Sequence, residues 1–217
     1  LSVIKIPKTE NIHDVLQEIS QLEDVELVEL DQIQYGAGKL AYVPNDSFYS
    51  RQWSFSNDGT FSLATAKVGA DIKMQQAWDI EKGSSNTIVA VIDTGCRLDH
   101  PDLLGRYWLN PNEIDNNGID DDNNGYIDDI YGWDFVNNTN TPVDDHGHGT
   151  NIAGIIGANT NNSIGYSGIN MFCKIMSLKA LNKDNTGFTS DIINALYYAA
   201  NNGAKVINMS LGGGHSV

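Results

Sequence analysis

The chain has 217 residues, enough for one large domain and a smaller one. Its 28 acidic and 13 basic residues give a formal net charge of -15, which argues against nucleic-acid or anionic-membrane partners. No apolar run approaches the roughly 20 residues that span a bilayer. The two cysteines, Cys96 and Cys173, are too few for a disulfide framework, and both lie in apolar stretches, which favours buried small hydrophobic residues.

Residues 1–35 are predicted to form a strand, a helix and a second strand. Apolar residues over 1–6 and a mixed apolar and acidic run over 25–33 are typical of strands. Residues 36–47 contain Gly, Pro, Asn and Asp and indicate a linker. A unit with one helix on so little sheet needs a partner surface, although an independent α+β module is an alternative. The helix is indicated by apolar residues at helical spacing: Ile12, Val15, Leu16 and Ile19.

After the linker, apolar strands alternate with helices around a long polar region at 95–147. This alternation predicts an α/β fold with a parallel sheet. Thr189 or Ser190 is expected to cap the last helix, and Gly154 to allow close helix–sheet packing. We expect helices over 70–78, 151–158 and 189–201, and strands over 87–93, 173–181 and 205–211. The face of the last helix that we expect to be buried comprises Ile192, Ile193, Leu196, Tyr197 and Ala200.

Two polar residues lie where sites form in parallel α/β proteins. Asp93 ends a buried strand, and such strand ends carry sites in open sheets. Taken alone, the segment around Asp93 favours an ordinary strand-end carboxylate that begins a turn. His148 lies where a helix begins, between two glycines. It is two residues from His146, and no Glu follows at zincin spacing, so a metalloprotease is disfavoured.

The segments around these residues resemble the subtilases, a family of serine proteases. Val91-Ile92-Asp93-Thr94-Gly95 resembles their catalytic-aspartate motif, and the segment from His148 to Gly154 resembles their catalytic-histidine motif. Ser210-Leu211-Gly212-Gly213 resembles a wall of their specificity pocket. The resemblance runs from about residue 44 to residue 217. It implies a subtilisin-like α/β fold, helices around a parallel sheet, with residues 48–217 as the N-terminal part of the catalytic domain.

The resemblance also implies roles for particular residues. His148 would act as the general base, and Asp93 would orient and stabilise its ring. The family's nucleophilic serine and oxyanion-hole asparagine follow the pocket motif, so we expect both to lie beyond residue 217 and residues 1–217 to be inactive alone. The implied substrate-binding residues are Asn185, Thr186 and Gly187 at one edge of the cleft, and Ser210, Leu211 and Gly212 at the other.

An acidic loop follows the Asp93 segment and is typical of a calcium site. Asp120, Asp122 and Asn124 alternate before Gly125, as at the start of an EF-hand loop. The twelfth position is Tyr131, so the usual closing Glu is absent. A disordered acidic loop is the alternative. The residues that could complete the calcium ligands are Glu113, Asp115, Asp128 and Asp129.

The resemblance implies a second calcium site and a propeptide. Residues 12–33 resemble the second half of a subtilase propeptide, which would act as an intramolecular inhibitor, with its tail around 33–40 in the cleft. We expect two or more Ca²⁺ ions. The second site would use the side chains of Asp46, Asp102 and Asn162 and the backbone oxygens of Thr160, Ile164 and Tyr166.

These observations lead to one function and two rivals. The predicted function is a secreted, calcium-stabilised serine endopeptidase made as a zymogen, acting on polypeptides, monomeric, with no nucleic-acid partner and no membrane span. A non-catalytic subtilase relative that only binds peptides is the first rival. A calcium-stabilised adhesion or cell-wall module is the second.

Overall fold

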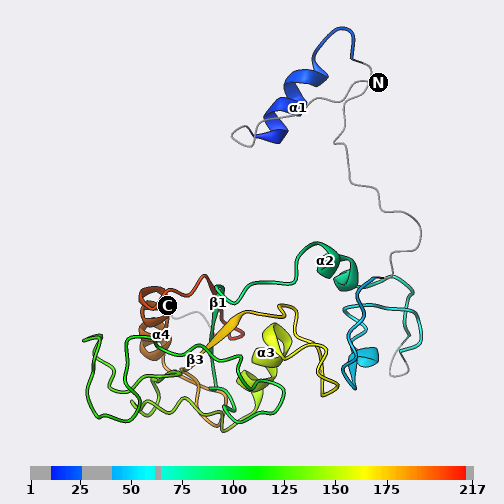
Figure 1. Cartoon of the computed structure of the whole chain (residues 1–217). Helices are drawn as coiled ribbons and strands as arrows, with labels where there is room; N and C mark the ends of the chain where they lie inside the picture. The colour runs from blue at the N-terminus through cyan, green and yellow to red at the C-terminus, as the bar shows by residue number, and fades with distance from the viewer. Residues whose placement is uncertain (1–10, 26–40, 62–64, 214–217) are drawn as a thin grey trace. The chain divides into compact units, whose positions relative to one another are not determined.

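The structure, a computed structural model, describes residues 11–25, 41–61 and 65–213. The chain divides into two units, Leu1–Leu40 and Ala41–Val217 (Figure 1). The described part of the first unit contains helix α1, Ile12–Ser20, which confirms the helix predicted there. The strands predicted over 1–6 and 25–33 fall almost entirely outside the described residues. The division between the units falls inside the predicted linker at 36–47.

The second unit is built on a parallel sheet, which confirms the predicted α/β fold. Its four strands are β1 (Ile88–Asp93), β2 (Gly132–Asp134), β3 (Lys174–Lys179) and β4 (Val206–Asn208). They lie in the order β2-β3-β1-β4, and each neighbouring pair is parallel. The helices are η1 (Tyr49–Arg51), α2 (Met74–Ile80), α3 (His148–Gly157) and α4 (Thr189–Asn201). Within the described residues, no helix is long and apolar enough to cross a membrane.

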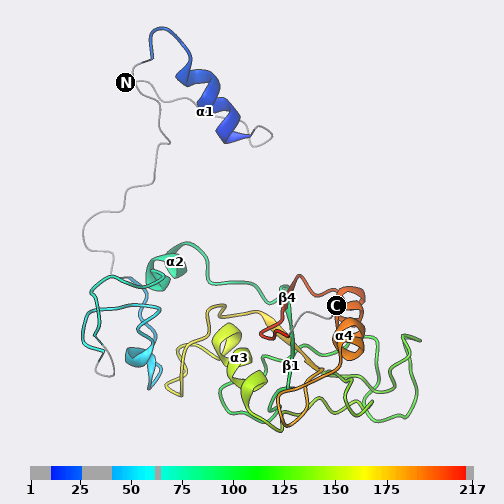
Figure 2. The ribbon, with the colours of Figure 1, turned by 180° about the vertical axis from the view of Figure 1, so that it is seen from behind.

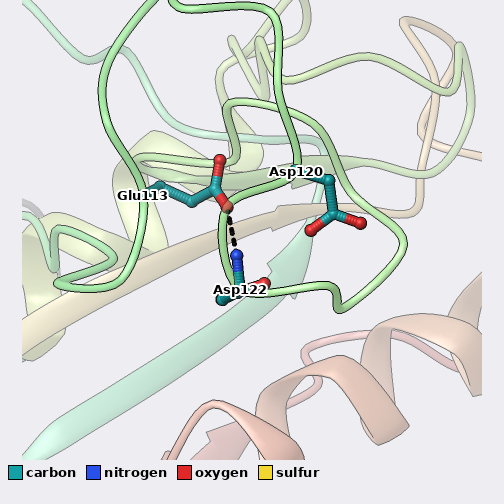
Figure 3. Close-up of side chains that lie close together, drawn as sticks. All are labelled: Glu113, Asp120 and Asp122. Atoms are coloured by element: carbon teal, nitrogen blue, oxygen red, sulfur yellow. Dashed lines mark hydrogen bonds between the residues drawn. The ribbon is translucent and has the colours of Figure 1, made fainter.

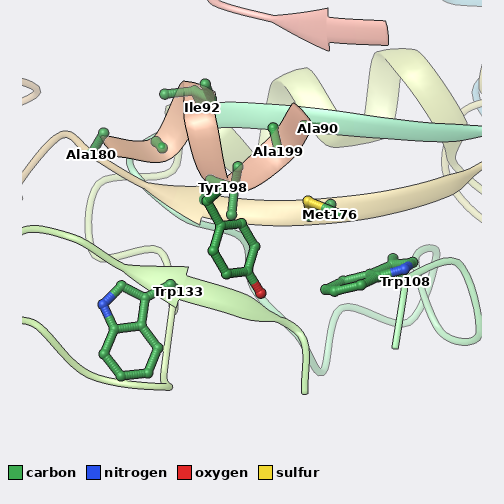
Figure 4. Close-up of a cluster of buried hydrophobic side chains, with 10 residues drawn as sticks. Ala90, Ile92, Trp108, Trp133, Met176, Ala180, Tyr198 and Ala199 are labelled. Carbon is green, nitrogen blue, oxygen red and sulfur yellow. The ribbon is translucent and has the colours of Figure 1, made fainter. Parts of the chain in front are cut away.

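Helices α3 and α4 cover opposite faces of β1. Side chains alternate between the two faces along a strand. Ala90 and Ile92 pack in one buried cluster with Ala199 of α4 (Figure 4). Val91 packs in another with Ala153 of α3. Figure 2 shows the ribbons of α3 and α4 on either side of β1. Because both faces are covered, β1 is apolar throughout until Asp93.

The face of α4 that contacts the sheet agrees only in part with the predicted one, since Ile192 and Leu196 pack against the core cluster while partly buried. Ala195, Tyr198 and Ala199 are buried, whereas Tyr197 is 67% exposed and Ile193 is 45% exposed. The two alanines allow the helix backbone to approach the sheet closely, so the buried face turns toward these small residues. The N-cap prediction was also wrong, since Thr189 and Ser190 lie inside α4 and its N-cap is Phe188, without a side-chain capping bond.

Other elements also differ from the predictions. α2 begins at Met74 rather than at residue 70 and ends at Ile80 rather than at residue 78. β2 was missed because it is three residues long and lies in a polar region. α3 begins at His148, as expected from the position of that residue, rather than at residue 151, where the apolar run begins, and backbone N–H groups at this end find acceptors in the preceding loop. β4 ends at Asn208 rather than at residue 211, because it pairs with β1 only over Val206–Asn208.

A third apolar cluster attaches residues 41–80 to the sheet-bearing part of the unit. Its centre is Trp78, which is 1% exposed and donates from Nε1 to the backbone oxygen of Ile169 at 2.8 Å. This packing places the segment around Asp46 beside the loop that follows α3, since Asn161 and Asn162 donate backbone hydrogen bonds to that carboxylate. The cluster comprises Tyr49, Phe55, Met74, Trp78 and Met171.

Candidate active site and calcium sites

The structure brings Asp93 and His148 together at the end of β1. His148 Nδ1 lies 2.8 Å from Asp93 Oδ1 and 3.0 Å from Oδ2. The Asp93 side chain is fully buried, whereas that of His148 is 33% exposed. Asp93 therefore contacts one ring nitrogen from the interior, which leaves Nε2 as the nitrogen available for proton transfer.

Close backbone packing brings the strand end and the helix start together. Gly149 follows His148, and a Cβ there would lie 2.1 Å from the backbone oxygen of Gly95 and 3.2 Å from Asp93 Cβ. Only a residue without a side chain fits this approach. The expectation that Gly154 serves this purpose is wrong, because a Cβ at Gly154 would meet nothing within 4 Å. At the other end of α3, a Cβ at Gly157 would lie 3.0 Å from the Cys173 sulfur.

Both cysteines are buried, as the sequence predicts, and the structure shows that they are unpaired. Burial raises the pKa of the Cys96 thiol to about 12. Burial likewise raises the pKa of Cys173. The thiolate is the reactive form of cysteine, so neither residue suits a nucleophilic role.

The predicted substrate-binding residues follow the carboxyl ends of β3 and β4, the two strands that flank β1. Parallel neighbours end at the same edge of a sheet, so these segments and Asp93 share that edge. Gly187 lies against β3, where a Cβ would meet the backbone oxygen of Ala180 at 2.0 Å. Leu211 packs against the core cluster, and Ser210 Oγ accepts a bond from Asn208. The roles of Asn185, Thr186, Gly187, Ser210, Leu211 and Gly212 stay predictions.

Asp46, Asp102 and Asn162, from three separate segments, converge on one place. Asp46 and Asp102 are 5% and 4% exposed. Asn162 donates from its backbone to Asp46 Oδ1 at 3.1 Å and from Nδ2 to Asp102 Oδ1 at 2.8 Å. The loop that contains Thr160, Ile164 and Tyr166 wraps Asp102, with the Tyr166 N–H donating to Oδ2 at 3.1 Å.

This cluster fits a calcium ion. Asp46 and Asp102 supply carboxylate oxygens, the ligands that Ca²⁺ requires, whereas the Asn162 amide directs Nδ2 toward Asp102. Burial, and to a smaller extent the charge of Asp46, raises the pKa of Asp102, against the hydrogen bonds that lower it. A bound cation would offset both unfavourable effects. A Cβ at Gly165 would meet Asp102 Oδ2 at 2.3 Å, so the loop closes tightly around the carboxylate.

The acidic loop forms a second cluster. Among the described residues, Glu113, Asp120 and Asp122 place carboxylate oxygens within 4.8 Å of one another (Figure 3). Glu113 Oε1 accepts from the backbone N–H groups of Asp121 and Asp122, and its Oε2 from that of Asp128. The cluster supplies the hard oxygen ligands that suit calcium.

The other predicted loop ligands lie outside this group of three. Asn124 donates to Asp122 and Asp129 through Nδ2. Asp129 is fully buried and also accepts from Asn110 and from the Tyr198 hydroxyl. Asp115 is exposed and accepts from Asn116. The calcium-binding roles of Asp115, Asn124 and Asp129 stay predictions.

Several residues that complete these sites were missed from the sequence. Asp144 accepts from Thr94 Oγ1 and from backbone groups at the start of α3. Buried Lys179 donates from Nζ to the backbone oxygen of Thr94 and to Asp145 Oδ1. Ser167 donates to Asp46. Only Asp144 had a sequence signal, as an acidic residue just before the start of a helix.

A buried strand-end carboxylate bonded to the imidazole at the start of a helix, on a parallel sheet, is an arrangement of hydrolases with an Asp–His–nucleophile triad. The chain belongs to the subtilase family, whose model matches residues 84–217. The resemblance on which the sequence analysis relied is thereby confirmed.

Two relatives and one solved structure show the extent of the similarity. The chain is 34% identical over 211 residues to the thermophilic serine proteinase of Bacillus sp. (strain AK1), covering 97% of this chain and 43% of the relative. It is 42% identical over 158 residues to subtilisin-like protease 1 of Plasmodium berghei (strain Anka), covering 72% and 26%. The Aeromonas sobria serine protease, solved in complex with the chaperone ORF2, matches with a TM-score of 0.61 at 22% identity, covering 79% and 26%. The chain therefore spans less than half the length of these proteins.

Proposed function

We propose that the protein is a serine endopeptidase of the subtilase type, stabilised by calcium and made as a zymogen. The observation that supports this most strongly is the contact between His148 Nδ1 and the buried Asp93 carboxylate at 2.8 Å. The nucleophile that the proposal requires is the serine expected outside residues 1–217.

In the proposed reaction, His148 moves the proton. A serine hydroxyl is a weak nucleophile at neutral pH and needs a base within hydrogen-bond reach. Nε2 of His148 would take the serine proton during attack on the peptide carbonyl and then give it to the leaving amine. Asp93 would keep the proton of the neutral ring on Nδ1 and stabilise the imidazolium that forms.

The substrate is proposed to be an extended polypeptide. Ser210 to Gly212 would pair with its backbone as an added strand, and Asn185 to Gly187 would border the opposite side. Support comes from the sheet order, because these segments follow the two strands that flank β1 and so share its carboxyl edge with Asp93.

Calcium is proposed to bind both carboxylate clusters. At Asp46, Asp102 and Asn162 it would neutralise two buried carboxylates and tie the segment around Asp46 to the loop after α3. The acidic-loop ion would sit among Glu113, Asp120 and Asp122, with the other predicted loop ligands close by. Such ions resist local unfolding and self-digestion, which suits a secreted protein in calcium-rich surroundings.

Residues 1–35 are proposed to be part of an inhibitory propeptide. The alignment with the thermophilic serine proteinase covers 97% of this chain, so the similarity extends into the first unit. The protein is further proposed to be monomeric and secreted.

A serine-directed fluorophosphonate probe tests the activity on the full-length protein after removal of the first unit. The proposal predicts one labelled serine, and labelling that is lost when His148 is replaced by Ala. A folded protein from which the first unit has been removed, and which takes up no probe, would sink the protease assignment in favour of a peptide-binding or adhesion role.

A further inference from the structure

The Asp144 carboxylate accepts five hydrogen bonds, more than a loop carboxylate needs if its role is only to keep the surface soluble. Its Oδ1 accepts from Thr94 Oγ1 at 2.8 Å and from the backbone N–H groups of His146 and Gly147 at 2.9 and 2.7 Å. Its Oδ2 accepts from the backbone N–H of Thr150 at 2.9 Å and from the Thr150 hydroxyl. These five donors come from both sides of His148 and from the turn after β1.

Thr94 connects this carboxylate to the proposed catalytic pair. Its side chain is buried, and its Oγ1 donates to Asp144 while accepting from the backbone N–H of Gly149 at 2.9 Å. Its own backbone N–H donates to Asp93 Oδ1 at 2.7 Å. A continuous chain of hydrogen bonds therefore runs from the Asp93 carboxylate through Thr94 to the residue after His148.

Asp144 also acts as a capping residue for α3. The residue at the N-cap position is Gly147, with φ of 103° and no side chain to accept from the first turn. The first N–H groups of a helix need acceptors from outside it. Asp144, three residues before Gly147, accepts from the Thr150 N–H, and Thr94 Oγ1, which donates to Asp144, accepts from the Gly149 N–H. The negative charge of Asp144 also suits the positive end of the helix.

We propose that Asp144 is a positioning residue for the catalytic pair. By bonding the Thr94 hydroxyl and the backbone on both sides of His148, it fixes the helix start that carries the imidazole relative to the strand end that carries Asp93. The catalytic consequence rests on the proposed serine protease function, whereas the positioning itself can be measured without any nucleophile.

The adjacent acidic residue offers a matched control. Asp145 has a 49% exposed side chain and accepts from Lys179 Nζ at 2.6 Å. Asp145→Asn removes one negative charge, as Asp144→Asn does, but retains an oxygen that can accept the lysine bond. Comparing the two variants separates the contacts of Asp144 from the general effect of losing a charge in this loop.

The test is nuclear magnetic resonance of the full chain with ¹⁵N-labelled histidine. The Nδ1 proton between His148 and Asp93 gives a resonance that His148→Ala identifies by its loss. We expect Asp144→Ala and Asp144→Asn to shift and broaden this resonance while the far-ultraviolet circular dichroism is retained. We expect Asp145→Asn to leave it unchanged. An unaltered resonance in the Asp144 variants would overturn the proposal.

Thr94 provides a second test should the Asp144 variants fail to fold. Thr94→Val keeps the shape of the side chain but removes the hydroxyl, and Thr94→Ser keeps the hydroxyl. The proposal predicts a disturbed His148 resonance in Thr94→Val and a preserved one in Thr94→Ser. Equal resonances in wild type and Thr94→Val would overturn it.

Kinetics of the full-length protein separate this proposal from the proposed function. We expect Asp144→Ala to lower kcat up to about 10²-fold with little change in KM, since small misplacements of a catalytic group have that cost. A resonance that responds in a protein without peptidase activity would support the positioning role and refute the protease assignment. An active protease whose kcat is unaffected by Asp144→Ala would overturn the positioning role alone.

Discussion

The Asp93 site and the acidic loop both contain carboxylates in fixed positions, but the surroundings of these carboxylates differ. The Asp93 carboxylate lies at the end of a buried strand, and its partners are a backbone N–H and an imidazole. The loop cluster of Glu113, Asp120 and Asp122 gathers three carboxylates on irregular backbone, held mainly by backbone N–H groups. Lysine and arginine are absent from residues 107–173 of the sequence.

This contrast indicates different roles for the two sites. A carboxylate with an imidazole partner on rigid elements can orient a base without any ion. Three carboxylates that form no ion pair among the described residues repel one another and gain most from a bound cation. The pair at Asp93 is therefore predicted to be sensitive to substitution, and the loop to calcium.

The largest expected effect comes from neutralising the buried carboxylate. Asp93→Asn should lower kcat by about 10⁴-fold, because the amide favours the wrong tautomer of His148. Asp99→Asn is the control, since its side chain is 79% exposed and, among the described residues, forms an ion pair with Arg97 alone. Peptide hydrolysis by the full-length protein measures both, and a loss below about tenfold for Asp93→Asn would contradict the assigned role.

Removal of calcium should lower the thermal stability of the protein. At a calcium concentration of about 100 times the Kd, binding contributes about 2.7 kcal/mol. For a domain of this size, that corresponds to a fall in Tm of roughly 5 to 10 °C when a chelator is added. Thermal unfolding followed by circular dichroism measures the shift.

Variants locate the calcium effect in one cluster or the other. Asp102→Asn and Asp122→Asn should each reduce the chelator-induced shift, whereas Asp184→Asn, with a 66% exposed side chain, should not. A Tm that does not respond to chelator in any variant would refute both proposed ions.

Two glycines of the same helix test how tightly α3 must approach β1. Gly149→Ala would place a Cβ 2.1 Å from the Gly95 backbone oxygen and should cost about 1–3 kcal/mol of unfolding free energy. Gly154→Ala meets no atom within 4 Å and should be neutral or stabilising by up to about 1 kcal/mol. Urea unfolding distinguishes them, and equal stabilities would contradict the packing described.

The smallest effect concerns acid stability. Although burial opposes ionisation, hydrogen bonds from Thr150, Gly147 and His146 together hold the pKa of Asp144 below its usual range. A lowered folded-state pKa contributes stability above about pH 4, which is lost as the pH falls through the folded value. The difference in unfolding free energy between wild type and Asp144→Asn should shrink below about pH 4. A difference that is constant from pH 3 to 7 would contradict this contribution.

Sequence patterns predicted the parallel sheet because β1 is an apolar run up to Asp93, and because β3, although it contains Ser177 and two lysines, carries the buried apolar residues Ile175, Met176 and Leu178. They were right in part on the buried face of α4, where Ile192 and Leu196 pack against the core, but Ala195, Tyr198 and Ala199 are buried in place of the predicted Ile193 and Tyr197. They also failed on the role of Gly154, because spacing alone does not show which glycine faces the strand.

The candidate sites divide in the same way. Asp93 and His148 were predicted from motifs whose positions, a strand end and a helix start, determine the geometry. Asp144 and Ser167 were missed because their bonds depend on how loops close over 50 to 121 positions of sequence separation. The loop ligands were predicted as a set, but local spacing did not distinguish Asp129, which bonds Tyr198, from the three carboxylates that cluster.

The central claim is that His148 is the base of a serine protease, and a comparison of two histidines tests it most directly. His146 lies two residues away, with ring centroids 6.4 Å apart, and within the described part of the chain it is the ring of His148, not that of His146, that bonds Asp93. In the full-length protein, kcat for a peptide substrate should fall by about 10⁶-fold in His148→Ala. The fall should be less than about tenfold in His146→Ala, since that ring has no role in proton transfer. Comparable activities of the two variants would contradict the claim.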